Sequence, residues 1–259
     1  MTALLEVSNL TRQFGGLTAV RDLSFSVTPQ EILGIIGPNG AGKTTAVNLM
    51  SGVIRPTAGT VTFDGQVITG QSPHRLVRSG LVRTFQSTTV FADRTVHENA
   101  LRGAFLSIYP GAFHTFFGTA RARRMRLETE QRVDELLEWL GLTDVAHLTA
   151  GNLPYGYQKT LGLVIALASR PRLIMLDEPV AGLSAEEVDQ VRETILRVRD
   201  SGITVVVIDH NMRFIKGLCD RVLVIHQGHE LAIGKPLDVL ADPAVIEAYL
   251  GRGHAAAHR

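Results

Sequence analysis

A run of eight residues matches the phosphate-binding loop pattern G-x-x-x-x-G-K-S/T. The run consists of Gly37, Pro38, Asn39, Gly40, Ala41, Gly42, Lys43 and Thr44. Glycines let the backbone turn tightly so that successive N–H groups point at phosphates, and the helix that follows adds the partial positive charge of its N-terminus. Lys43 is then expected to reach the β- and γ-phosphates and Thr44 to bind Mg²⁺ through its hydroxyl, while Thr45 is expected to contact the nucleotide.

Two adjacent carboxylates, Asp177 and Glu178, follow the apolar run 173–176, which is typical of a fully buried strand. Ligands of open α/β sheets bind at the carboxyl ends of the strands, so this edge should coincide with the phosphate site. Asp177 suits coordination of Mg²⁺, directly or through water, and Glu178 suits polarisation of an attacking water as a general base. Together with the phosphate-binding loop, the pair predicts hydrolysis of a nucleoside triphosphate.

His210 comes just after a second buried run, 203–208, and should stand at the same sheet edge. A lone histidine is usually structural, but at this edge it could contact the γ-phosphate. Gln86 closes the segment 81–86 before a helical region and carries no chemical signal of its own.

These motifs resemble those of an ABC ATPase, and the resemblance covers nearly the whole chain. In chain order, the family's Walker A, Q-loop, signature, Walker B and H-loop correspond to the P-loop, Gln86, the stretch 153–158, the acid pair and His210. The resemblance implies that Phe14 stacks on adenine, that Gln86 takes part in catalysis and in binding Mg²⁺, and that residues 182–184 form the D-loop. It also implies a pair of ATPase subunits, with ATP held between the P-loop of one and the signature of the other.

The finer resemblance is to the ATPases of branched-chain amino acid importers. It rests on the segments RQFGGLTAV at 12–20, RTFQ at 83–86 and VIEAYLG at 245–251. This implies two transmembrane permease subunits, a second ATPase subunit, identical or different, and an extracytoplasmic solute-binding protein as partners. The chain would then sit on the cytoplasmic face of the inner or plasma membrane, held there by the permeases.

The signature segment departs from the family's usual L-S-G-G-Q, because it reads LPYGYQ at 153–158. Tyr155 is compatible with the importer subfamily, whereas Pro154 removes the serine hydroxyl that contacts the γ-phosphate in other members. Tyr155 and Gly156 are the residues expected to contact the nucleotide from this segment. The backbone amides after Pro154 and the helix that begins there are expected to replace the missing serine.

The elements around these motifs predict an α/β fold. Short β-rich segments at 23–27 and 31–36 and a hairpin at 60–68, with Asp64-Gly65 as a type I′ turn, precede a helical region from about 95 to 165. In that region, residues 133, 136, 137 and 140 form one apolar helix face before Gly141. Two buried strands then flank a helix that opens with a Ser184–Glu187 capping box, which implies a parallel sheet.

Taken with these elements, the resemblance implies the fold of a P-loop ABC ATPase, which is α/β with a mixed β core and parallel sheet, an antiparallel β subdomain and an inserted helical subdomain. Residues 1–90 and 166–250 form its discontinuous ATP-binding core. The helical subdomain with the signature takes 91–165, and residues 251–259 form a flexible tail.

Composition excludes several other classes of protein. The 259 residues contain 26 Lys+Arg and 25 Asp+Glu, so no long-range field favours nucleic acid. The longest apolar run, 161–168, is far shorter than the roughly 20 residues of a membrane-spanning helix, and no secretory signal is expected at the start. The single cysteine, Cys219, is expected to be a packed small side chain in a reducing compartment.

Two alternative functions remain open from the residues. One is an export-type ABC ATPase, such as those that extract lipopolysaccharide; the other is a soluble ABC protein of translation or DNA repair, which usually carries tandem ATPase units or a long coiled coil that this chain lacks. The transported solute also stays open, because its contacts lie on other subunits. An arginine cluster at 121–126 is interpreted as a solvated helix face, with contact to the permeases as the alternative.

Overall fold

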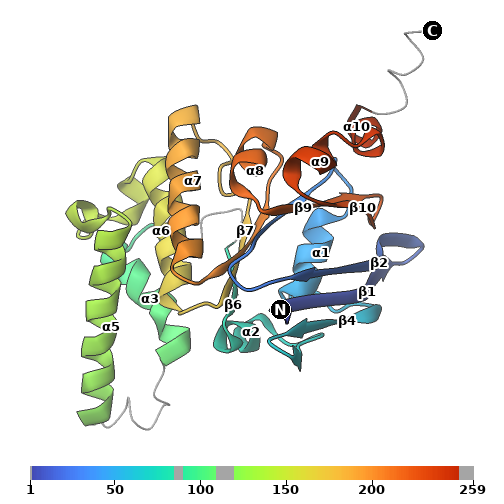
Figure 1. Ribbon diagram of the computed structural model, residues 1–259. Coiled ribbons are helices and arrows are strands. Elements are labelled where there is room, and N and C mark those ends of the chain that lie inside the picture. Colours follow the sequence, from blue (N-terminus) through green and yellow to red (C-terminus); the bar gives the residue numbers. More distant parts are fainter. Residues whose placement is uncertain (1, 85–89, 109–119, 251–259) are drawn as a thin grey trace.

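The computed structural model describes residues 2–84, 90–108 and 120–250, and the side chains within these ranges except those of 105–108 and 120–122. Figure 1 shows two sheets and a group of helices set to one side. The first sheet is antiparallel, with strand order β2-β1-β4-β5. Its strands are β1 (Leu5–Phe14), β2 (Leu17–Val27), β4 (Ala58–Phe63) and β5 (Gln66–Val67).

The second sheet has six strands in the order β10-β9-β3-β8-β7-β6. These are β3 (Ile32–Ile36), β6 (Leu81–Arg83), β7 (Leu173–Asp177), β8 (Thr204–Ile208), β9 (Arg221–His226) and β10 (His229–Gly234). All neighbours are parallel except β9 and β10. Every residue of β3, β7 and β8 is buried, because helices or the other sheet cover both faces of a parallel sheet.

Some of the helices pack on the two faces of this second sheet and others form the lobe to one side. The helices are α1 (Lys43–Met50), α2 (Pro73–Ser79), α3 (Val96–Ile108), α5 (Ala120–Trp139), α6 (Tyr155–Ala168), α7 (Ala185–Asp200), α8 (Met212–Leu218), α9 (Pro236–Leu240) and α10 (Pro243–Leu250), with short 3₁₀ turns at Thr143–Val145 and Ala150–Asn152. In the described part of the chain, none of the helices is long and apolar enough to cross a bilayer.

Among the described residues, three hydrophobic cores follow from this layering. In the first, the buried apolar side chains of α1 pack together with those of strands from both sheets. The second core fills the other face of the six-stranded sheet beneath α6, α7 and α8. The third lies inside the helical lobe formed by α3, α5 and α6.

Several local expectations are confirmed. Asp64 and Gly65 both have positive φ, 51° and 73°, as a type I′ turn between β4 and β5 requires. Ser184 and Glu187 form the capping box at the start of α7, and β7-α7-β8 is a parallel unit. The apolar face of α5 is buried in the helical lobe, and Gly141 follows the helix with φ 72°.

The helical lobe is continuous with the core through α6. This helix runs to Ala168, three residues beyond the expected subdomain boundary at 165, and its buried side chains contribute to both the second and the third core. The division into subdomains stays a prediction. The tail 251–259 lies outside the described residues.

The arginine cluster of α5 is exposed where its side chains are described. Arg124 bonds to Glu128 and Arg126 to Glu130, each at 2.9 Å and one helical turn apart. Such pairs stabilise an exposed helix by about 0.3–0.5 kcal/mol each. This arrangement agrees with a solvated face, and contact with a permease stays a prediction.

Candidate phosphate-binding and catalytic site

The phosphate-binding loop connects the buried strand β3 to helix α1. A side chain at Gly37 would place its Cβ 2.1 Å from the carbonyl oxygen of Ile225, and one at Gly42 would place it 2.4 Å from that of Ala19. Both glycines also have positive φ, so any other residue would be strained as well as crowded. Neighbouring backbone thus surrounds the loop closely, and this packing keeps its turn in place.

Lys43 begins α1, and its side chain folds back over the loop. Its Nζ donates hydrogen bonds to the carbonyl oxygens of Gly37, at 2.7 Å, and Pro38, at 3.0 Å. Burial lowers the pKa of Lys43, while the Glu178 carboxylate acts in the opposite direction. The ammonium group and the amides that follow Gly42 therefore form a compact positive site at the N-terminus of a helix.

Asp177 ends β7 and is buried. Its Oδ2 accepts a hydrogen bond from Nη2 of Arg83 at 2.7 Å, and both side chains are almost fully shielded from solvent. Arg83 lies at the end of the neighbouring strand β6, and its Nη1 donates to Asn48 Oδ1 of α1 at 2.6 Å. The arginine thus connects the first of the two carboxylates to the helix that carries the phosphate-binding loop.

Glu178 and His210 meet at the carboxyl edge of the sheet, as the sequence predicted. Glu178 has φ 48°, a conformation that non-glycine residues rarely adopt, and its N–H donates to Ile208 O at 2.8 Å. His210 Nδ1 lies 3.7 Å from Glu178 Oε1. Uncommon backbone conformations of this kind cluster at functional sites, where the surrounding structure holds them.

The signature segment opens α6. Pro154 is the N-cap residue and α6 starts at Tyr155. The N-terminus of α6 lies against the start of α7. A Cβ built on Gly156 would lie 2.8 Å from Glu187 Oε1, and one built on Gly182 would lie 3.3 Å from the Tyr155 ring. The expected signature and the expected D-loop are therefore neighbours within one chain.

Phe14, the expected adenine-stacking residue, ends β1 and is 43% exposed. The guanidinium of Arg12 lies over its ring, 4.5 Å from the ring centre. A half-exposed aromatic ring of this kind offers a stacking surface for a base. Gln86 lies outside the described residues.

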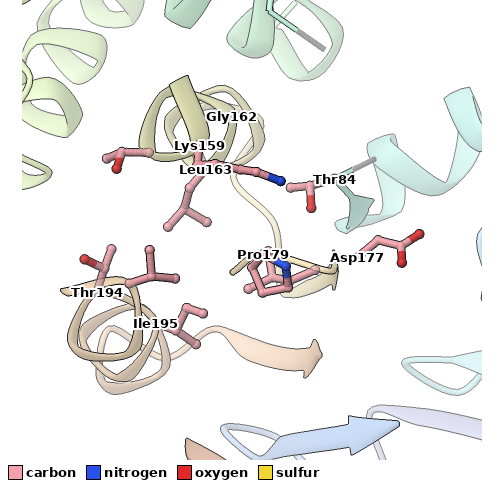
Figure 2. A pocket seen from close by; sticks show the side chains of 11 residues that line it. Thr84, Lys159, Gly162, Leu163, Asp177, Pro179, Thr194 and Ile195 are labelled. Atoms are coloured by element: carbon pink, nitrogen blue, oxygen red, sulfur yellow. The ribbon is translucent and has the colours of Figure 1, made fainter. Parts of the chain in front are cut away.

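A small cavity next to Asp177 is not the nucleotide site. It has a volume of about 60 Å³, and side chains of β7, α6 and α7 line it. Figure 2 shows Leu163 and Ile195 on its walls and the carboxylate of Asp177 directed away from the α7 side chains. This volume holds a few water molecules at most, so nucleotide would bind over the open phosphate-binding loop instead.

Sequence reasoning missed four residues around the site. Arg83 binds Asp177, Lys159 of α6 donates to the Glu178 carbonyl oxygen at 3.5 Å, and Glu187 faces Gly156. The hydroxyl of Tyr249 in α10 lies near the backbone of Gly37, and burial raises its pKa to about 12. Only Arg83 gave a local signal, as a charged residue ending an otherwise apolar strand.

Comparison with known proteins agrees with this geometry. The family described as "ABC transporter" matches residues 20–181, and the family described as "Branched-chain amino acid ATP-binding cassette transporter" matches residues 230–255. A solved nucleotide-free ATP-binding cassette from an ABC transporter superposes with a TM-score of 0.84 at 30% identity, covering 96% of this chain and 100% of that one. A cassette solved in its ADP conformation has the same score and identity and covers 97% of this chain.

The chain therefore belongs to the ABC transporter family, as an ATP-binding and ATP-hydrolysing cassette. Its similarity extends over almost its whole length to named transport ATPases. It is 39% identical over 249 residues to the high-affinity branched-chain amino acid transport ATP-binding proteins BraF of Pseudomonas aeruginosa and LivG of Escherichia coli, covering 96% of this chain and 98% of each relative. It is 33% identical over 251 residues to the lipopolysaccharide export ATP-binding protein LptB of Acidithiobacillus ferridurans, covering 97% of this chain and 98% of that one.

Proposed function

We propose that this chain hydrolyses ATP to energise the import of branched-chain or related amino acids. The observation that carries the proposal is the 39% identity to BraF and LivG across 96% of the chain. The match of residues 230–255 to the branched-chain amino acid cassette family supports it at the C-terminal end, beyond the region common to ABC transporters.

The proposed complex contains two transmembrane permease subunits, a second ATPase subunit and an extracytoplasmic solute-binding protein. The chain lies on the cytoplasmic face of the membrane and is held there by the permeases. In this arrangement the solute contacts belong to other subunits, and this chain supplies the free energy of ATP hydrolysis.

In the proposed site, the loop amides and Lys43 bind the β- and γ-phosphates, and Phe14 stacks on the adenine. Glu178 is the general base that takes a proton from the attacking water. His210 lies 3.7 Å from that carboxylate. It contacts the γ-phosphate and orients the Glu178 carboxylate relative to it. The positive φ of Glu178 supports this role, since it aims the carboxylate from a constrained turn.

We infer that Mg²⁺ binds together with the nucleotide, through Thr44, Asp177 and Gln86. In the described part of the chain, no three His, Cys, Asp or Glu side chains are grouped so as to hold a metal ion by themselves. A hydroxyl and a carboxylate oxygen nevertheless fit Mg²⁺, which takes its other ligands from phosphate oxygens and water. The bound ion would neutralise the charge that develops on the phosphates.

The start of α6 is proposed to contact the ATP of the second ATPase subunit through Tyr155 and Gly156. Pro154 has no N–H to offer, but the amides after it lie at the N-terminus of a 14-residue helix, where an anion is favoured. The exposed ring of Tyr155 supports the assignment of this end of the helix to a contact surface.

Reconstitution with the permeases would test the proposal. We expect the ATPase rate of the complex in proteoliposomes to rise when the binding protein is loaded with a branched-chain amino acid. Glu178→Gln should keep ATP affinity and lose nearly all hydrolysis, because the amide keeps the shape of the side chain but is no base. A complex whose ATPase rate does not change with any amino acid tested would refute the import function. A Glu178→Gln rate within a few-fold of wild type would remove Glu178 from its role.

A second candidate function is export, in the manner suggested by the relative LptB. The observation that favours it is 33% identity over 97% of the chain. Import is preferred because the identity to the importer ATPases is higher over the same length. Stimulation of the ATPase rate by lipopolysaccharide, and not by a loaded binding protein, would support the export function.

A further inference from the structure

Arg83 joins the two parts of the site that the proposed function assigns to Mg²⁺. Its guanidinium donates to Asp177 Oδ2 at 2.7 Å through Nη2, and to Asn48 Oδ1 at 2.6 Å and Ser51 Oγ at 3.1 Å through Nη1. One planar group thus bridges the end of β7 and the C-terminal half of α1. The bridge is buried, with only 6% of the arginine side chain and 10% of the aspartate side chain exposed.

The α1 end of this bridge lies directly behind the phosphate-binding loop. Asn48 follows Thr44 by four residues, so the two side chains lie on the same face of the helix, one turn apart. A displacement of Asn48 relative to Asp177 would therefore change the distance between the Thr44 hydroxyl and the Asp177 carboxylate. These are the two proposed metal ligands among the described residues.

The bridge also orients the carboxylate. Arg83 holds Oδ2, and among the described residues no second hydrogen bond to the Asp177 carboxylate is found, so Oδ1 is the oxygen left for the ion or for its bound water. Arginine suits this task, because its rigid fork holds two partners in fixed directions, whereas a lysine ammonium is a single point on a flexible stem. Partners that orient a metal ligand typically affect metal affinity about 10–100-fold.

We propose that Arg83 is a positioning residue that sets the spacing and orientation of Thr44 and Asp177 for Mg²⁺. The inference rests on the proposed function, which makes these two residues the metal ligands. Arg83 itself touches neither substrate nor metal. Its effect is therefore on the part of nucleotide affinity that depends on the divalent ion.

The test measures the affinity of the chain for a non-hydrolysable ATP analogue by calorimetry, once with Mg²⁺ and once with EDTA. We expect Arg83→Met to lower the ratio of the affinity with Mg²⁺ to the affinity with EDTA about tenfold or more. The affinity with EDTA should stay within about threefold of the wild type. Arg83→Lys should restore the ratio only in part, because an ammonium cannot hold both partners in the fork geometry. Arg75→Met is the matched control: this exposed arginine of α2 should leave the ratio unchanged.

A second variant keeps the proposal falsifiable if Arg83→Met fails to fold, which thermal unfolding would reveal. Asn48→Ala combined with Ser51→Ala removes both contacts of Arg83 with α1 and leaves the Arg83–Asp177 pair. If Arg83 acts as a bridge, this double variant should lower the ratio; if Arg83 is only a counter-ion of Asp177, the ratio should not change. An unchanged or raised ratio in folded Arg83→Met, or an unchanged ratio in the Asn48→Ala/Ser51→Ala double variant, overturns the proposal. If the wild-type affinity is the same with Mg²⁺ and with EDTA, the metal assignment within the proposed function fails instead.

Discussion

Gly103 lies in α3 where the helix passes close to the backbone of α6. A Cβ built on Gly103 would lie 2.2 Å from the carbonyl oxygen of Ile165. At an exposed helix position, Gly→Ala stabilises the helix by about 0.5–1 kcal/mol. Here the methyl group meets backbone that no rotamer change can move away, so overpacking should cost about 3 kcal/mol, the upper part of its usual range. We therefore expect Gly103→Ala to destabilise the protein by about 2 kcal/mol net.

Gly162 provides a matched control on the facing helix. A Cβ at this position has no neighbour within 4 Å, so Gly162→Ala should show only the helix-propensity gain. For a chain of this size about 1 kcal/mol shifts the melting temperature by about 2–4 °C. Calorimetry without nucleotide should find the melting temperature lowered by about 4–8 °C in Gly103→Ala and raised by about 1–4 °C in Gly162→Ala. A Gly103→Ala protein that melts at or above the wild type would refute the close helix contact.

The remaining predictions concern the site and the single cysteine. Lys43→Ala should weaken ATP binding at least about tenfold, since it removes a charge-assisted contact to phosphate; an unchanged dissociation constant would count against the P-loop assignment. Gly156→Asp should keep ATP binding and lose hydrolysis, through repulsion of the partner's γ-phosphate. Because Glu187 also faces this position, the Glu187→Gln background serves as the control, and recovery of hydrolysis there would assign the loss to repulsion within the chain. Pro154→Ser should keep or raise the ATPase rate of the complex with permeases, and an inactive variant would contradict a working signature. Burial raises the pKa of the Cys219 thiol, so it should resist a thiol reagent in the native protein and react once urea unfolds the chain; rapid reaction in the native state would disprove its burial.

The close approach of α3 and α6 also bears on function. The N-terminus of α6 carries the proposed signature, and the same helix contributes to the cores of both the helical lobe and the sheet. A methyl group between α3 and α6 would shift that N-terminus without touching the P-loop. Gly103→Ala should therefore reduce the ATPase rate more than the ATP affinity.

Short-range patterns in the sequence were enough to predict the nucleotide chemistry and the elements that carry its motifs. The P-loop needs glycines, a lysine and a hydroxyl at fixed spacing, and the capping box needs Ser184 and Glu187 three residues apart. The buried strands were recognisable because a parallel sheet requires apolar residues on both faces. Such requirements act within a few residues, so they can be read without knowing the partners of each element.

Tertiary structure alone decided which further residues contact the predicted site residues. Arg83 and Asp177 are 94 positions apart and become partners because β6 lies beside β7 in the sheet. The approach of Glu187 to Gly156 likewise depends on the packing of α7 against α6. Strand order and helix packing depend on how much apolar surface all the segments bury together. They therefore cannot be predicted from any single segment. The sequence by itself therefore determined the kind of chemistry and the ends of the strands that bear it, whereas the folded chain determined how the carboxylate of Asp177 is held.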